Sequence, residues 1–247
     1  MVSNKQSKFI KSLKIKKYRS KEMCFLAEGR KNVLEGIMNG LSLRYLLATS
    51  QFIKDNEEAL AIVESKVLET TADVLTDLGT FTTNNDCLAV FEMPAINTSM
   101  DFSEHVLVLD GISDPGNLGT IIRTMDWFGM KQLICSENTA DFYNPKVVNA
   151  TMGSYSRINV RYMDLPALLR QSPIPAYGAD LDGKAMNQWK SAGPVVLVMG
   201  SESHGISPEV IPLLTGKVTI PRIGEAESLN VGVATGILCH HLCFNLS

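Results

Sequence analysis

Short apolar segments in the second half of the chain constrain the fold most strongly. Six of them follow residue 105, at 106–109, 132–135, 158–162, 176–178, 195–199 and 218–220. The stretches between them are punctuated as helices are, since Asn117 can cap a helix that Gly129 ends and Ser207 with Pro208 can start another. Continuous apolar strands that alternate with helices are typical of a parallel sheet covered on both faces. An α/β fold is therefore predicted for this half.

The first half predicts a smaller α/β unit. Strand-like runs at 45–48, 66–69 and 88–91 are separated by stretches with helical periodicity. The residues between Phe91 and His105 then include a proline and show little periodicity. We therefore predict two domains, 1–95 and 104–247.

Basic residues are concentrated at the amino end. Residues 1–21 contain eight lysines and arginines and no acid, whereas the whole chain has 23 basic and 26 acidic residues and a net charge of -3. A basic end suits a polyanion such as RNA, although a solvated helix face or a frayed tail has the same composition. The candidate RNA-binding residues are Lys14, Lys16, Lys17, Arg19 and Arg30.

Cysteine spacing and hydropathy exclude several classes of protein. Five cysteines without a CxxC pair argue against a disulfide framework or a common zinc ribbon. Residues 239–243 hold two cysteines and two histidines, but on a helix His240 and His241 point about 100° apart, so no metal site is predicted. No apolar run reaches the roughly 18 residues of a membrane span, and no signal-peptide core is present. We expect a soluble cytoplasmic protein with no membrane partner.

Three polar, glycine-containing segments each follow a predicted strand, at 110–123, 200–206 and 220–230. In α/β sheets, ligands bind at the carboxyl ends of strands, so these segments are the candidate site. Residues 200–205 lack the Lys-Ser/Thr that ends a P-loop, and residues 114–119 lack GxGxxG spacing. Neither an NTPase nor a dinucleotide enzyme is indicated.

Taken in order, the three segments resemble the signature motifs of the SpoU (TrmH-type) family of RNA ribose 2'-O-methyltransferases, within the SPOUT superfamily. The resemblance covers the chain from about residue 106 to the end, and the first domain is similar to the L30e-like substrate-binding domain often fused in this family. It implies a C-terminal SPOUT domain with a deep trefoil knot, a homodimer, and S-adenosylmethionine as cofactor. The apolar last helix, 231–244, fits a buried or dimeric contact.

The resemblance also implies where the cofactor binds. In the family, its adenine and ribose lie in the knot and are held largely by main-chain groups of the second and third motifs. The matching positions are Met199, Gly200, Gly205, Ile220 and Leu229. Glycines suit such a site because side chains would intrude between the backbone and the adenine.

The matching catalytic residues are Asn117, Arg123, Glu202, Ser228 and Asn230. Methyl transfer to a ribose hydroxyl requires that a group accept the hydroxyl proton. Family proposals make the arginine the base, yet a guanidinium is normally protonated. Two roles for Arg123 stay open: a perturbed base, or a cation that clamps the adjacent phosphate and stabilises the developing alkoxide.

Two positions depart from the family pattern. Asn149 stands where many members have arginine, and Thr151 where serine is common, which puts an RNA phosphate contact at Asn149 in doubt. Trp127 and Phe128 could stack on bases, but their spacing beside Ile121 favours a core position.

The leading hypothesis is methylation of a ribose 2'-hydroxyl in structured RNA, with 23S ribosomal RNA favoured. A transfer RNA ribose methyltransferase is the alternative within the enzyme class, and a base-nitrogen methyltransferase fits the catalytic residues less well. A non-catalytic RNA-binding or ribosome-assembly protein of the same fold is the alternative from another class. The intact set of polar motif residues argues against the non-catalytic protein.

Overall fold

The computed structural model describes residues 2–95 and 100–244. Packing divides the chain into unit 1, which comprises residues 1–95 and 141–157, and unit 2, which comprises residues 96–140 and 158–247. Residues 141–157 thus pack with the amino-terminal unit, although they lie within the predicted domain 104–247. No described helix is both long enough and apolar enough to cross a membrane.

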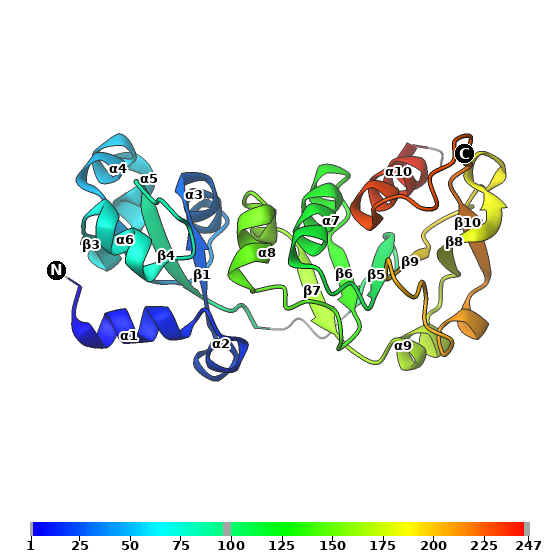
Figure 1. Ribbon diagram of the computed structural model, residues 1–247, viewed down its shortest axis with the longest axis horizontal. Helices are drawn as coiled ribbons and strands as arrows, with labels where there is room; N and C mark the ends of the chain where they lie inside the picture. Colours follow the sequence, from blue (N-terminus) through cyan, green and yellow to red (C-terminus); the bar gives the residue numbers. More distant parts are fainter. Residues whose placement is uncertain (1, 96–99, 245–247) are drawn as a thin grey trace. The chain divides into compact units, whose positions relative to one another are not determined.

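Unit 1 is built on a four-stranded sheet in the order β1-β4-β2-β3 (Figure 1). Strands β1 and β2 pair antiparallel with β4, and β2 pairs parallel with β3. The strands are β1 (Cys24–Glu28), β2 (Leu43–Ala48), β3 (Val67–Glu69) and β4 (Cys87–Glu92). The helices are α1 (Asn4–Ser12), α2 (Lys16–Glu22), α3 (Arg30–Met38), α4 (Ser50–Asp55), α5 (Glu57–Leu60), α6 (Ala72–Leu78) and α8 (Pro145–Ala150), with 3-10 turns η1 (Ala61–Lys66) and η2 (Ser154–Ser156).

The segment 141–157 is an integral part of the unit 1 core. The ring of Phe25 on β1 lies 4.6 Å from that of Tyr143 and 5.6 Å from that of Tyr155, measured between centroids. The Tyr155 hydroxyl donates a hydrogen bond to the Asn32 carbonyl at 2.8 Å. Because these contacts are buried aromatic and polar ones, removing the segment would expose the face of β1.

Unit 2 contains six strands, all parallel, in the order β10-β8-β9-β5-β6-β7. They are β5 (Val106–Asp110), β6 (Gln132–Cys135), β7 (Asn159–Tyr162), β8 (Ala176–Ala185), β9 (Val196–Gly200) and β10 (Gly216–Thr219). The helices are α7 (Pro115–Trp127), α9 (Leu165–Gln171) and α10 (Val231–Phe244), with 3-10 turns η3 (Met186–Gln188) and η4 (Ile211–Leu213). Every residue of β5 and β6 is buried, as their apolar sequences predict. The predicted α/β class with a parallel sheet is confirmed, and the trefoil knot stays a prediction.

Candidate functional site

The first two motif loops leave the same edge of the unit 2 sheet side by side. In the parallel register of β5 and β9, Asp110 lies opposite Gly200, so both strands end together. The Asp110 side chain is 7% exposed, and its carboxylate accepts a hydrogen bond from the Ser207 backbone N–H at 2.7 Å. Asp110 therefore ties the loop after β9 to the end of β5.

The loop after β9 is a tight turn that requires its glycines. The Ser201 and Gly205 backbones donate to each other at 3.0 and 2.9 Å, and Gly205 has a φ of +66°. A Cβ on Gly200 would lie 2.2 Å from the Gly205 carbonyl carbon, so no side chain fits there. A Cβ on Gly205 would meet nothing within 4 Å. Gly200 is thus needed by the turn itself, whereas Gly205 borders open space.

Two helix starts meet this turn. Asp114 caps α7 by accepting from the Asn117 N–H at 2.8 Å, which sets Asn117 in the first helical turn. Asn230 precedes α10, and its Oδ1 accepts from the Gly232 and Val233 N–H groups at 3.0 and 3.3 Å. Both caps satisfy backbone donors that a helix start leaves free.

Three predicted catalytic side chains, Asn117, Glu202 and Asn230, form one hydrogen-bonded group, which we call the polar cluster. Glu202 Oε2 accepts from Asn117 Nδ2 at 3.0 Å, and Glu202 Oε1 accepts from Asn230 Nδ2 at 2.9 Å. Asn230 Nδ2 also donates to Asn117 Oδ1 at 2.9 Å, and the Val231 N–H donates to Glu202 Oε1 at 3.3 Å. Glu202 therefore joins the starts of α7 and α10 through both carboxylate oxygens.

Arg123 and Ser228 lie outside this cluster. Arg123 is exposed on α7, six residues beyond Asn117 and hence about 9 Å further along the helix axis. Ser228 is exposed in the loop after β10. Within the described residues, neither side chain is hydrogen-bonded to a member of the polar cluster. The structure thus brings together three of the five predicted catalytic residues.

One of the predicted cofactor positions, Leu229, lies in an exposed loop whose backbone donors have no partner in the described chain. Residues 221–230 are all exposed, and within the described chain no backbone N–H of 222–229 donates a hydrogen bond. Leu229 is 46% exposed and Ile220 partly buried, whereas Met199 is 2% exposed and offers only its main chain. Free amide groups beside apolar side chains and the open space at Gly205 fit an adenosine, which combines polar ring edges with an apolar face.

The predicted RNA-binding residues differ in availability. Lys14, Lys16 and Lys17 are exposed. Arg19 is not available, because it is 2% exposed, forms an ion pair with Asp141 and donates to the Leu13 carbonyl at 2.8 Å. The prediction of an RNA contact at Arg19 is therefore wrong: its guanidinium anchors the segment 141–157.

Arg30 and the two departures from the family pattern also have partners in unit 1. Arg30 lies 3.2 Å from Asp55 and 3.6 Å from Asp86, which partly neutralise it. Asn149 Nδ2 donates to Thr80 Oγ1 at 3.4 Å, and Thr151 is buried with its hydroxyl donating to the Val148 carbonyl.

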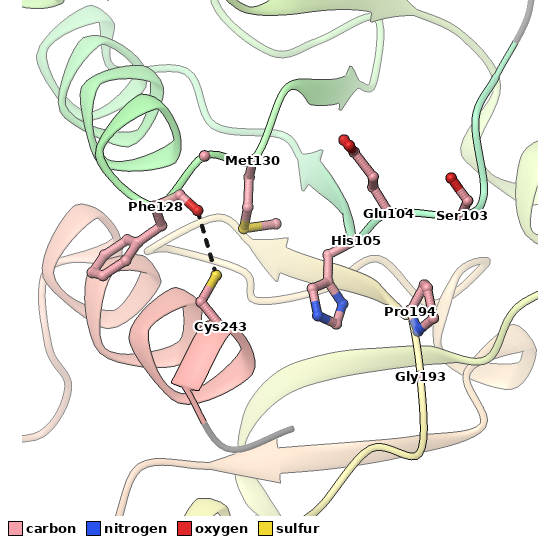
Figure 2. A pocket seen from close by; sticks show the side chains of 9 residues that line it. Ser103, Glu104, His105, Phe128, Met130, Gly193, Pro194 and Cys243 are labelled. Carbon is pink, nitrogen blue, oxygen red and sulfur yellow. Dashed lines mark hydrogen bonds between the residues drawn. The ribbon is translucent and has the colours of Figure 1, made fainter. Parts of the chain in front are cut away.

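A cavity of about 320 Å³ lies at the opposite edge of the unit 2 sheet (Figure 2). It is lined by Ser103, Glu104, His105, Phe128, Gly129, Met130, Gly193, Pro194 and Cys243. His105 and Pro194 precede β5 and β9, so the cavity faces the amino ends of the strands. Burial lowers the pKa of the His105 imidazole and raises that of the Cys243 thiol, which keeps both groups neutral. No motif residue lines this cavity.

Two features escaped the sequence analysis. Asp110 lies within the first motif at the end of an apolar strand, and this position is the sequence signal for its role in joining β5 to the loop after β9. Trp127 is 84% exposed, so its predicted core position is wrong, although Phe128 is partly buried. Helical spacing places residues on one face of a helix but does not say what covers that face.

Comparisons with known proteins place both units. The SpoU rRNA Methylase family model matches residues 104–240, and the MRM3-like substrate binding domain matches residues 4–89. The 23S rRNA (guanosine(2553)-2'-O)-methyltransferase RlmP of Bacillus subtilis is 30% identical over 97% of this chain and 96% of its own length. A TrmH-family protein from Porphyromonas gingivalis is 37% identical, with a TM-score of 0.85 over 98% of each chain. An rRNA methyltransferase from Sinorhizobium meliloti with bound AdoMet is 28% identical, with a TM-score of 0.87 over 98% of this chain and 95% of that chain.

Proposed function

Because the chain belongs to the SpoU rRNA methylase family, we propose that it methylates a ribose 2'-hydroxyl of 23S ribosomal RNA with S-adenosylmethionine. The observation that carries the proposal is the polar cluster, which joins all three motifs at the carboxyl edge of the parallel sheet. Relatives named for 23S rRNA ribose methylation, and one solved with AdoMet bound, support the choice of substrate and cofactor.

The proposed mechanism assigns binding and orientation to the three loops. When bound, S-adenosylmethionine supplies an electrophilic methyl group on a positively charged sulfur. Free N–H groups of residues 222–229 and the backbone beside Gly205 would hold its adenosine, and Leu229 and Ile220 would supply apolar contacts. The polar cluster fixes the starts of α7 and α10, so that both helices present their exposed side chains at constant positions.

Arg123 is assigned the phosphate and the developing alkoxide. Its guanidinium is exposed, and the planar fork of that group binds phosphate oxygens through two parallel hydrogen bonds. This accessibility to a bound phosphate supports the clamp. Phosphate or water then accepts the hydroxyl proton, and Ser228 lies in the same exposed loop as the cofactor amides, within the third motif.

The exposed lysines of unit 1 are assigned the RNA backbone. Lys14, Lys16 and Lys17 lie in a segment without acidic residues, and their charges are free to neutralise phosphates. We propose the cytoplasm as the place where the protein acts on ribosomal RNA.

A second copy of the chain is the proposed partner of the α7 and α10 surface. The two helices pack closely, since a Cβ on Gly232 would lie 3.0 Å from Thr120. Their outer side leaves Trp127, Val233 and Phe244 exposed by 84, 52 and 69%. These apolar side chains support a second copy as the partner of this surface. Light scattering should give the mass of a dimer, and Trp127→Glu should lower it.

The test of the enzyme is transfer of labelled methyl from S-adenosylmethionine to unmodified ribosomal and transfer RNA pools, followed by nucleoside analysis. We expect 2'-O-methylated nucleosides in the ribosomal pool, and their loss with Arg123→Ala but not with Arg170→Ala, an exposed arginine on α9. Label in the transfer RNA pool alone would favour that substrate. No label together with no cofactor binding would contradict the enzyme and favour a non-catalytic RNA-binding protein.

A further inference from the structure

The basic segment of unit 1 is an ordered pair of helices rather than a loose tail. Ser3 and Gln6 form a capping box at the start of α1, and Ile10 and Leu13 are fully buried in the unit 1 core. Arg19 fixes α2 through Asp141 and the Leu13 carbonyl. The directions of the remaining side chains are therefore set by the fold.

The inward direction of Arg19 decides which side of α2 faces solvent. Lys17 and Lys21 are four residues apart and Tyr18 and Lys21 three apart, so the three are neighbours on the helix surface. All three are exposed, and Tyr18 is 40% exposed. Ile15 and Met23, at the two ends of α2, are 55 and 50% exposed and extend the apolar surface beside the tyrosine.

Tyr18 differs from the other aromatic residues of unit 1. Phe9 packs edge-on against Tyr45, and Phe25 lies among Phe91, Tyr143 and Tyr155. Among the large exposed hydrophobic side chains of the described unit 1, Tyr18 is the only aromatic one, and no described ring stacks on it. A flat apolar ring is thus open to solvent in the most basic part of the chain.

The charges around Tyr18 select the ligand. Lys14, Lys17 and Lys21 are exposed, whereas Glu22, four residues after Tyr18 and the one acid of α2, is partly buried. The Asp141 carboxylate is paired with Arg19. A positive surface with an exposed aromatic ring fits a nucleic acid with an unstacked base, because the base stacks on the ring while lysines neutralise adjacent phosphates. A duplex offers its phosphates but keeps its bases stacked.

We propose that Tyr18, Lys14, Lys17 and Lys21 form a binding site for an unpaired nucleotide of the RNA substrate. The site rests on the proposed function and names how unit 1 selects RNA: by a single-stranded or looped-out nucleotide, with stacking on Tyr18 and phosphate contacts to the three lysines. Since every base has a stacking face, the site tolerates different bases.

Fluorescence anisotropy of the full chain with a labelled single-stranded RNA, and with the duplex that it forms with its complement, tests the site. We expect Tyr18→Ala to weaken single-strand binding about tenfold with an unchanged salt slope, and Tyr18→Phe to bind like the parent. Lys17→Ala with Lys21→Ala should lower the slope of log Kd against log salt by about 1.4, at about 0.7 per phosphate contact. Lys54→Ala with Lys66→Ala, which removes two other exposed lysines of unit 1, is the matched control and should change neither.

Three outcomes would overturn the site: an unchanged affinity in Tyr18→Ala, equal losses for single strand and duplex, or a Tyr18→Phe variant as weak as Tyr18→Ala. Each variant is checked for its thermal unfolding midpoint. S-adenosylmethionine binding without RNA is measured in parallel, because it depends on unit 2. If the parent protein does not bind S-adenosylmethionine, the proposed function is refuted. If it binds the cofactor but Tyr18→Ala binds RNA as tightly as the parent does, only this site is refuted.

Discussion

The two edges of the unit 2 sheet differ in what their polar groups do. At the amino edge lies the cavity of Figure 2, where two of the lining side chains have partners: His105 Nδ1 accepts from the Val195 N–H at 3.1 Å, and the Cys243 thiol donates to the Phe128 carbonyl. At the carboxyl edge, the loop 221–230 is exposed, and no backbone N–H of residues 222–229 donates a hydrogen bond within the described chain. We expect the ligand at the carboxyl edge, where backbone N–H groups are open to solvent, rather than in the cavity at the amino edge.

The largest expected effect at the carboxyl edge is that of replacing Glu202. Glu202→Gln places an amide N–H₂ against donors from Asn117, Asn230 or Val231, so the polar cluster cannot close. We expect single-turnover methyl transfer to fall about a thousandfold, or about 4 kcal/mol. Glu209 is an exposed acid shortly after the second motif, and the control variant Glu209→Gln should keep the parent rate. A loss of less than about threefold in Glu202→Gln would remove the cluster from the mechanism.

The amino edge should respond in stability instead of activity. Met130 is 4% exposed and lines the cavity, so Met130→Ala enlarges it and should lower the free energy of unfolding by about 3 kcal/mol in urea titrations. The affinity for S-adenosylmethionine, measured by calorimetry where the variant is folded, should not change. A lower affinity of Met130→Ala for S-adenosylmethionine would indicate that the cofactor binds at the amino edge instead of the carboxyl edge.

Asn230 separates helix capping from the polar cluster. In Asn230→Ser a side-chain oxygen can still cap the start of α10, but the donor to Asn117 and Glu202 is lost and no second carboxylate is placed against Glu202. Methyl transfer should fall at least about tenfold, while stability should change less than the loss of about 1 kcal/mol expected for Asn230→Ala. If the loss of activity in both Asn230 variants simply follows their loss of stability, Asn230 acts only as a helix cap.

The smallest effect concerns pH at the amino edge. Burial lowers the pKa of His105 below its ordinary value of about 6.5, so the unfolded chain takes up a proton at a higher pH than the folded chain does. The contribution to stability is therefore fully present above the ordinary pKa and decreases as the pH falls through it. The difference in unfolding free energy between the parent and His105→Asn should change in this direction below about pH 6.5. A difference that is constant with pH would contradict it.

Much of unit 2 followed from the sequence because its strands are buried on both sides. Residues 106–109 and 132–135 are continuous apolar runs, and the structure has β5 and β6 there. The segment 141–157 could not be placed in the same way, because its packing on β1 depends on Tyr143, Tyr155 and the ion pair of Asp141 with Arg19. These contacts join residues more than a hundred positions apart, and local periodicity carries no information about them.

The candidate site shows the same division. Motif order identified Asn117, Glu202 and Asn230, and the register of β5 with β9 explains why the first two lie close together. Composition alone could not distinguish Arg19, which is buried, from Lys17, which is exposed. An ion pair with a distant acid reverses the direction of one basic side chain in a run of similar ones.

The parallel sheet, the family and the loops that carry the motifs can be predicted from the amino-acid sequence, because strand burial and motif order depend on consecutive residues. Which polar atoms have partners becomes visible in the folded chain. The tertiary structure closed the polar cluster around Glu202, turned Arg19 inward and Tyr18 outward, and left the backbone N–H groups of residues 222–229 without a partner in the described chain. Hydrogen-bond satisfaction depends on distances between segments remote in sequence, and those distances exist only once the chain has folded.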